Sequence, residues 1–529
     1  TGVGRQVIEE VGDGDCKSVK IETINVQQEK GKSSFWWMFL AGIGGGLIAL
    51  LTPCVFPMIP LTVSFFTKSG QSKGKGLFDA SFYGFCIILV YFLLSVPFIV
   101  FQISPTTLNE VSTNAPLNLV FFSIFIIFAI SFFGYFEITL PNSWANKADA
   151  ASNVGGMVGI FFMALTLALV SFSCTGPILG TVLVIAADGG DQSGFVGAMV
   201  GFGTALAFPF ALFAAFPKWL NSMPKSGGWL NSVKVVLGFL EVGLAMKFLS
   251  NADLVMQWGL VKREVFLAVW TICGLGVTLY LLGKIRFPHD SPNVKVGVTR
   301  ILFMLFFLGW TSYFAYGILG NNLKLISGFP PPLTYSYLHN ADAQLQEGGR
   351  DVFHDGKVYL VKEMENEEIK VWEKDGPEVK NEEEKAAVIE AMSHFDDCPL
   401  GALCFHDYYE GLAYAKLVNK PILIDFTGWA CVNCRRMEEN VWVDDEVERR
   451  IRDEYVLISL YVDDKRSLSK EDQYVSCESG KKINTIGRKW ADFQVTNFKK
   501  ASQPWYVLLS PDEQLLNESV GYTPSVSEY

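Results

Sequence analysis

Two cysteines in uncharged parts of the chain share the pattern Cys-x-x-Pro. Cys54 is followed by Pro57 and Cys174 by Pro177, and the two cysteines are 120 positions apart. Proline removes an amide donor and breaks a helix, which membranes tolerate where the backbone lines a cavity or packs on protein. Paired interruptions in two halves of a membrane chain usually mark its working site. The pattern therefore indicates a thiol site inside the membrane.

A third pattern, Cys431-x-x-Cys434, follows residues 422–426, which read as a buried strand. A helix is expected to begin at Cys431, and the positive end of a helix with its free amides favours a thiolate there. Cys434, one turn later and more buried, would close a disulfide. Asp425 is predicted to take the proton from Cys434; a merely structural polar residue at a strand end is the alternative.

Zinc is the other chemistry that a Cys-x-x-Cys pair suggests. A zinc site needs a second ligand pair at the right spacing, and the available Cys477 and His406 are isolated in the chain. No Gly-rich nucleotide loop is convincing either. We therefore expect no metal and no bound cofactor, only redox-active cysteine pairs.

The composition indicates a membrane protein with a soluble part. Half of the 529 residues are hydrophobic, yet the net charge is −11, so the acidic residues must gather outside the bilayer. The length predicts more than one domain. No basic stripe suggests a nucleic-acid partner. The ten cysteines are too scattered for a small disulfide scaffold.

Eight apolar stretches predict eight transmembrane helices in a lipid bilayer, at about 20 residues per crossing. The sixth is long enough only if it includes residues 231–234 or Glu241. The stretches are residues 35–67, 80–109, 111–136, 150–187, 192–217, 235–249, 265–283 and 301–322. Glycines 44 to 46 and Gly176 are expected to permit close packing or bending.

Lys and Arg set the expected orientation, because they concentrate in cytoplasmic loops. The first, fifth and seventh loops carry most of them; the sixth, with Lys262 and Arg263, opposes the trend. Odd loops are therefore predicted to be cytoplasmic. Both ends of the helical unit would face the periplasm of a Gram-negative cell, which places the chain in the inner membrane.

Three further residues inside the apolar stretches invite an interpretation. Glu241 is a candidate proton relay, since intramembrane acids are functional by default and disulfide reduction consumes protons. A structural acid facing a polar cavity is the equal alternative. Cys86 and Cys273 have no flanking proline and no repeat partner. We expect both to be buried, small apolar residues.

The chain divides into four parts. We expect a polar N-terminal remnant (1–33), an eight-helix domain (34–327), an extended acidic linker with some strand near residues 358–361 (328–400), and an α/β domain (401–529). The chain starts with Thr and ends before a further expected helix, so we expect a fragment cut at both ends.

The remaining cysteines are less telling. Cys16 is expected to be an isolated thiol or part of a lost upstream domain. Cys398 and Cys404 flank a short loop. On the oxidising side of a membrane they form either a local disulfide or two free thiols.

The α/β part resembles the thioredoxin superfamily. Residues 425–434 read DFTGWACVNC, with Trp429 two positions before Cys431, and look like the active-site segment of that fold. Gln503-Pro504-Trp505 lies where that fold has its cis-proline loop. The resemblance implies that Pro504 lies against the active-site sulfurs and pairs with a partner's backbone.

The helical part resembles the transmembrane domain of the DsbD/CcdA family, on the segments TPCVFPMIP (52–60) and SFSCTGP (171–177). The whole chain is similar to DsbD-type thiol:disulfide interchange proteins over residues 34–325 and 401–529. The implied fold is a membrane α-helical bundle with an inverted repeat, plus an α/β thioredoxin-like domain. Pro57 and Pro177 would open the helices. Family members usually carry a further redox domain before the membrane unit.

The resemblance also implies a function. Cys54 and Cys174 would form one reversible disulfide, reduced by cytoplasmic thioredoxin and oxidised by the outer thioredoxin-like domain. The chain would be a membrane protein-disulfide reductase that serves periplasmic disulfide proteins, including those of cytochrome c maturation. A quinone-linked disulfide oxidase and a solute transporter with an accessory thioredoxin domain are the alternatives.

Overall fold

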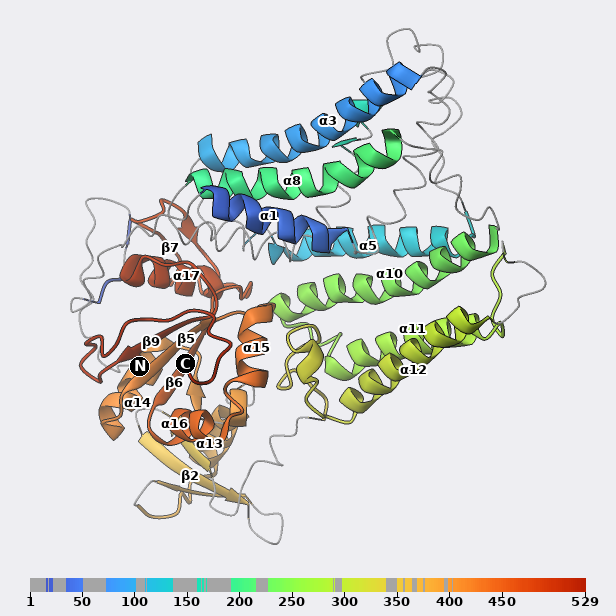
Figure 1. Cartoon of the computed structure of the whole chain (residues 1–529). Coiled ribbons are helices and arrows are strands. Elements are labelled where there is room, and N and C mark those ends of the chain that lie inside the picture. Colours follow the sequence, from blue (N-terminus) through green and yellow to red (C-terminus); the bar gives the residue numbers. More distant parts are fainter. Residues whose placement is uncertain are drawn as a thin grey trace.

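A computed structural model of the chain combines a bundle of long helices with an α/β domain at one end of them (Figure 1). The residues that it describes are 16–17, 19–21, 35–50, 73–100, 110, 112–136, 159–162, 164–165, 168, 192–215, 227–288, 290, 297–338, 350–354, 357–363, 369–373, 376–393, 398–401 and 403–529. Each of the eight predicted apolar stretches contains helical residues within these ranges.

The helices of the bundle pack in neighbouring pairs. Helix α8 lies against α1 and α3, α10 against α5 and α11, and α11 against α12. Their bounds are α1 (Phe35–Ala49), α3 (Lys73–Val100), α5 (Ala115–Phe132), α8 (Gln192–Ala215), α10 (Gly227–Met256), α11 (Arg263–Leu281) and α12 (Val298–Ile318). Helix α10 contains both residues 231–234 and Glu241, the residues that the sixth stretch needed to be long enough, and its 30 residues reach beyond 235–249 at each end.

Four helices in the described ranges are long and apolar enough to cross a membrane: Phe78–Val96, Ala115–Phe132, Arg263–Leu281 and Val298–Ile318. Two shorter apolar helices, Phe35–Ala49 and Gly194–Pro209, accompany them. The outer faces of these helices carry many exposed Leu, Ile and Phe side chains, as a lipid-facing surface requires. The count of eight spans and the inverted repeat stay predictions.

Small residues bring α1 and α8 close together. A Cβ atom on Gly42 would overlap the backbone of Ala198, and one on Gly46 would lie 2.6 Å from the Cβ of Ala205. Close approach of this kind is how membrane helices gain packing energy. Of the predicted packing glycines, Gly46 therefore lies at the contact. Gly44 has nothing within 4 Å and is not a packing residue.

A four-stranded mixed sheet forms the centre of the α/β domain, in the order β4-β6-β5-β9. Strand β5 pairs in parallel with β6 and antiparallel with β9. Every residue of β5 and β6 is buried, the polar Asp425, Thr427 and Ser459 included, because other parts of the fold cover both faces of these central strands. The strands are β4 (Cys404–Phe405), β5 (Ile422–Thr427), β6 (Val456–Tyr461) and β9 (Trp505–Leu509).

Capping residues mark the ends of the helices of this domain. These helices are α14 (Tyr408–Val418), α15 (Val432–Asn440), α16 (Asp445–Asp453) and α17 (Ile486–Phe498). Asp407 caps the start of α14, and Asn419, in the left-handed region, ends it before Pro421. Asp444 caps α16 in the same way. The strand–turn–helix reading of residues 422–440 is thus confirmed.

The acidic segment before this domain is not the extended linker that its composition suggests. It forms an antiparallel sheet, β1 (Arg350–His354), β2 (Lys357–Glu363) and β3 (Ile369–Glu373), followed by α13 (Glu382–Ser393). Val352, Val361 and Val371 are fully buried in the same core as β5 and β6. Composition misled the prediction because the acids lie between buried valines, and because acids at the start of α13 suit a helix N-terminus.

Cys16 is not an isolated thiol: it forms a disulfide with Cys477, 461 positions away. Lys17 pairs with Ser476 in a parallel bridge. Further along, the Ile21 amide donates to Asn497 Oδ1 at 2.7 Å. The segment before the first membrane helix is therefore bound to the α/β domain. Cys477 stands on the turn between β7 (Tyr474–Val475) and β8 (Lys482–Ile483).

The two remaining uncertain cysteines, Cys398 and Cys404, do form the local disulfide that was one of their two predicted states. Cys86 and Cys273 are buried free thiols, as expected.

Peptide mapping of the non-reduced protein should recover two structural links, Cys16–Cys477 and Cys398–Cys404. Replacing Cys477→Ser should remove the first link and expose one new alkylatable thiol, while the second link stays intact. Cys86→Ser is the matched control, because that thiol is already free and buried. A peptide joining Cys16 to any other cysteine would contradict this arrangement.

Candidate redox site

The Cys431–Cys434 pair is a disulfide at the start of α15, one turn after the end of β5. Cys431 is the N-cap residue, and its sulfur accepts the Cys434 amide at 3.1 Å. Cys431 is partly exposed, whereas Cys434 is only 1% exposed. A thiolate at Cys431 would meet the positive end of the helix, which stabilises it. Cys431 is therefore the sulfur that another protein or domain can reach.

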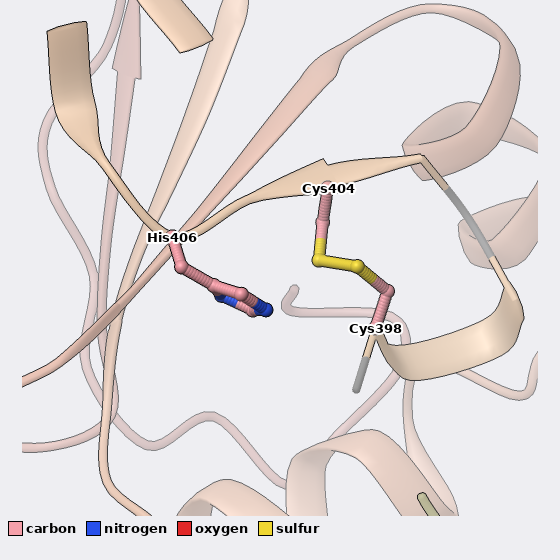
Figure 2. A group of neighbouring side chains, drawn as sticks. All are labelled: Cys398, Cys404 and His406. Atoms are coloured by element: carbon pink, nitrogen blue, oxygen red, sulfur yellow. A yellow bond between two sulfur atoms is a disulfide. The ribbon is translucent and has the colours of Figure 1, made fainter. Parts of the chain in front are cut away.

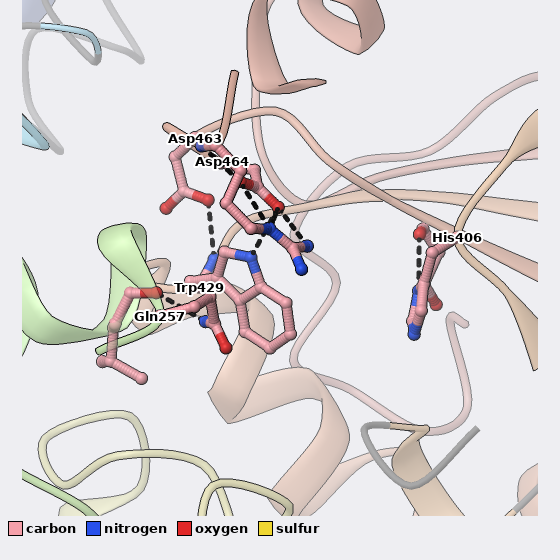
Figure 3. A network of polar contacts seen from close by, with 8 residues as sticks. Gln257, His406, Trp429, Asp463 and Asp464 are labelled. Carbon is pink, nitrogen blue, oxygen red and sulfur yellow. Dashed lines mark hydrogen bonds and ion pairs between the residues drawn. The ribbon is translucent and has the colours of Figure 1, made fainter. Parts of the chain in front are cut away.

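One buried carboxylate holds the turn before Cys431. Asp463 accepts the Trp429 amide at 2.8 Å (Figure 3). It also accepts the Ala430 amide at 2.9 Å. Gly428 leaves room for it, since a Cβ there would lie 2.8 Å from Asp463 Oδ2. Burial raises the pKa of Asp463, and the two amide bonds oppose that shift. The sequence analysis did not single out Asp463. Its position was a usable signal: Asp463 follows the buried strand β6, which runs parallel to β5, so the ends of both strands lie at the same edge of the sheet.

Trp429 is almost completely buried. Its ring stacks on Tyr461 at a centroid distance of 3.7 Å, and its indole N–H donates to Asp464 at 3.4 Å (Figure 3). Leu254, at the end of α10, and Tyr335 complete the same apolar cluster. The residue predicted to support the redox pair thus also contacts the helical part of the chain.

Buried ionisable side chains lie on β5 and α15, the two elements on either side of the turn that leads to Cys431. Asp425 is 1% exposed. Its burial is the main cause that raises its pKa well above the usual carboxyl range, and the negative charge of Glu438 raises it further, whereas the positive charge of Arg435 lowers it. Burial also raises the pKa of Glu438 to about 7, against the opposing effect of Arg435. Glu438 and Arg435 form an ion pair at 2.8 Å. A carboxyl with a raised pKa can exchange a proton with a thiol, whose ordinary pKa is about 8.5.

The peptide bond between Gln503 and Pro504 is cis. Pro504 immediately precedes β9, where Trp505 pairs with Phe426 beside the strand that leads to Cys431. The expected position of a cis-proline next to the active-site strand is confirmed. The contact of Pro504 with the sulfurs and with a partner's backbone stays a prediction.

The predicted membrane site lies outside the described residues. Cys54, Pro57, Cys174 and Pro177 all fall there, so their pairing remains a prediction. Glu241 is described: it lies in α10 and is 2% exposed. Its Oε2 has no hydrogen-bond partner among the described residues. Burial of a carboxyl in a membrane helix fits both interpretations given for it, and its relay role is untested.

One group of described side chains has the composition of a metal site: Cys398, Cys404 and His406, whose ligand atoms lie within 4.8 Å of one another (Figure 2). The two sulfurs are joined in a disulfide. Metal ligation requires thiolates, which a disulfide does not offer. The group in this oxidation state therefore does not fit a metal.

Replacing Asp425→Asn should slow release of a mixed disulfide by Cys434 by about 10²- to 10⁴-fold, the usual contribution of a positioned proton acceptor. Asn preserves the size of the side chain but cannot accept the proton. Because burial raises the pKa of Asp425, the wild-type rate should climb as pH rises through that elevated pKa, and the variant should lose this dependence. Stopped-flow kinetics of thiol release across a pH series measures both effects.

The matched control is Asp512→Asn, because Asp512 is an exposed turn residue of the same domain. It should retain the wild-type rate and pH profile. An Asp425→Asn protein with wild-type release kinetics would remove Asp425 from the reaction.

The chain matches two family descriptions. Residues 35–252 match the cytochrome c biogenesis protein transmembrane domain, and residues 408–527 match a thioredoxin-like domain. The first match covers the helices from α1 into α10. The second covers the sheet from β5 onward and the Cys431–Cys434 pair.

Curated relatives share both parts. The chain is 25% identical over 439 residues to the thiol:disulfide interchange protein DsbD of Vibrio vulnificus (strain YJ016), covering 82% of this chain and 59% of the relative. It is 34% identical over 227 residues to DsbD of Actinobacillus pleuropneumoniae serotype 5b (strain L20), covering 41% and 37%. The chain spans about three fifths of the length of the first of these relatives. The chain thus combines a cytochrome c biogenesis protein transmembrane domain with a thioredoxin-like domain, and over most of its length it is similar to proteins named thiol:disulfide interchange protein DsbD.

Proposed function

We propose that the chain is a protein-disulfide reductase of the bacterial inner membrane that passes electrons outward by serial thiol exchange. The observation that carries the proposal is the position of the Cys431–Cys434 disulfide. The turn before it packs on the end of membrane helix α10, through Trp429 with Leu254, and the Lys465 amide donates to the carbonyl of Val255 at 3.0 Å. The names of the relatives, thiol:disulfide interchange proteins, support the same reaction class.

In this proposal, cytoplasmic thioredoxin reduces the Cys54–Cys174 disulfide to two thiols. One membrane thiolate then attacks Cys431, and Cys434 leaves as a thiolate that takes a proton from Asp425. The other membrane thiol resolves the mixed disulfide, which restores the Cys54–Cys174 disulfide and frees Cys431. Two electrons have then moved to the thioredoxin-like domain: Cys434 is a thiol with the proton from Asp425, Cys431 is a thiolate, and the two membrane thiols have released their protons, without a metal or nicotinamide.

The output step runs through the same residues. The Cys431 thiolate attacks a disulfide of a periplasmic acceptor and forms a mixed disulfide with it. Cys434 attacks Cys431 and releases the reduced acceptor, while Asp425 takes the proton of Cys434. Disulfide isomerases and the thiols of cytochrome c maturation are the acceptors that we propose. Glu241 would carry protons within the membrane.

Cells that contain cytoplasmic thioredoxin should hold Cys431 and Cys434 mainly as thiols, and loss of thioredoxin should convert the pair to a disulfide. Differential alkylation followed by mass spectrometry measures the ratio. Cys54→Ser should have the same effect as thioredoxin loss, because it breaks the relay. Cys86→Ser is the matched control and should behave as the wild type.

Other outcomes would favour the alternatives. A pair that is oxidised in the presence of thioredoxin and follows the quinone pool would indicate a disulfide oxidase. Solute transport that survives Cys54→Ser would indicate a transporter.

The proposed orientation has its own test. A probe cysteine replacing Ser72, in the first loop, should react with a membrane-impermeant thiol reagent only after spheroplasts are opened. A probe replacing Ser527, exposed in the thioredoxin-like domain, should react in intact spheroplasts. Labelling of Ser72→Cys from outside would reverse the proposed topology.

A further inference from the structure

A buried ion pair joins the two domains. Arg263, the first residue of α11, lies 3.3 Å from Glu439, near the end of α15. Arg263 is 1% exposed and Glu439 is 4% exposed. The same guanidinium donates to the carbonyl of Pro331 at 2.6 Å. Removing one partner of a buried pair leaves an uncompensated charge, so such pairs make a contact specific.

The loop that follows α12, residues 322–338, adds hydrogen bonds around this pair. Asn440 donates to Ser327 Oγ at 2.7 Å. Asn322 donates to the carbonyl of Glu439 at 3.1 Å. The C-terminal end of α15 is therefore held by side chains of the helical part.

The same loop reaches the other end of α15, beside the disulfide. A Cβ atom on Gly328 would overlap the carbonyl oxygen of Val432, the residue after Cys431. Tyr335 packs in the cluster of Trp429 and donates to Asp253 at 2.8 Å. Two neighbours of Cys431 in sequence, Trp429 and Val432, are thus in contact with the helical part.

We propose that the 322–338 loop and the start of α11 form a docking site for the thioredoxin-like domain. In the docked position Cys431 faces the membrane domain, and Arg263–Glu439 is the contact that sets the register. This inference rests on the proposed function for its direction of electron flow. Because docking covers residues on both sides of Cys431, a protein acceptor and the membrane domain compete for one face. The domain must therefore leave the site to reduce an acceptor.

Replacing Glu439→Gln tests the docking site in the full-length chain in membrane vesicles. Gln has nearly the same volume but leaves Arg263 without its counter-charge. Reduction of Cys431–Cys434 by thioredoxin supplied on the cytoplasmic side should slow at least about tenfold, since unpairing a buried charge is strongly unfavourable. The rate at which the reduced domain attacks oxidised insulin, a bulky external disulfide, should stay the same or rise.

The matched control is Glu446→Gln, which breaks exposed ion pairs with Arg449 and Arg450 on α16. Both of its rates should equal the wild-type rates, because exposed pairs contribute little. Unchanged thioredoxin-dependent reduction in Glu439→Gln would overturn the docking site. Equal slowing of both rates would also overturn it, because Glu439 would then act on the sulfur chemistry itself.

A wild-type chain that thioredoxin does not reduce would contradict the proposed function, not the docking site. In that case, amide hydrogen exchange tests the docking site independently of the proposed function. Faster exchange of the amides in residues 322–338 of Glu439→Gln, with wild-type exchange in Glu446→Gln, supports it. Unchanged exchange in that loop overturns it.

Discussion

The position of the reactive sulfur depends on one buried carboxylate. Asp463 accepts the amides of Trp429 and Ala430, which would otherwise be unpaired in a part of the domain with little water. Asp463 follows β6, the parallel neighbour of β5, so the pairing of these two strands decides where the turn lies. The position of this turn places Cys431 at the N-cap of α15. A local sulfur geometry is thus set by the register of a sheet.

The buried ionisable side chains of β5 and α15 come at a cost to the stability of the fold. Asp425 and Glu438 are buried, and burial raises the pKa of each. Buried ionisable groups destabilise a domain unless they are paired. Among the described residues, Arg435 forms its ion pair with Glu438 and not with Asp425. Such clusters are typical of working sites. The proposed proton exchange with Cys434 would account for a carboxyl at position 425 where an apolar residue would cost less.

Helix α15 links the redox pair to the rest of the protein. Its first turn holds the disulfide, and its last turn holds Glu439 and Asn440, which contact Arg263 and Ser327. The helix has nine residues, about 13 Å at 1.5 Å per residue. The docking contact that we propose and the redox pair therefore lie at opposite ends of one short helix. The Cys16–Cys477 disulfide attaches the chain before α1 to the same domain.

The sequence by itself determined the features that depend on local patterns. Apolar runs predicted the membrane helices, and a buried strand followed by Cys-x-x-Cys predicted the turn and the start of α15. These predictions succeed because helix caps, chain breaks and burial leave signals within a few residues. The buried position of Asp425 was predicted on the same basis.

Only the tertiary structure decided the contacts between distant segments. Cys16 forms a disulfide with Cys477, and Arg263 forms an ion pair with Glu439. Asp463 accepts a hydrogen bond from the turn before Cys431. The tertiary structure also showed that the acidic residues before the thioredoxin-like domain hold a buried sheet. Composition averages over a whole segment, so it cannot show that Val352, Val361 and Val371 of an acidic segment are buried. Pairing between residues far apart depends on the path of the whole chain, which no local pattern encodes.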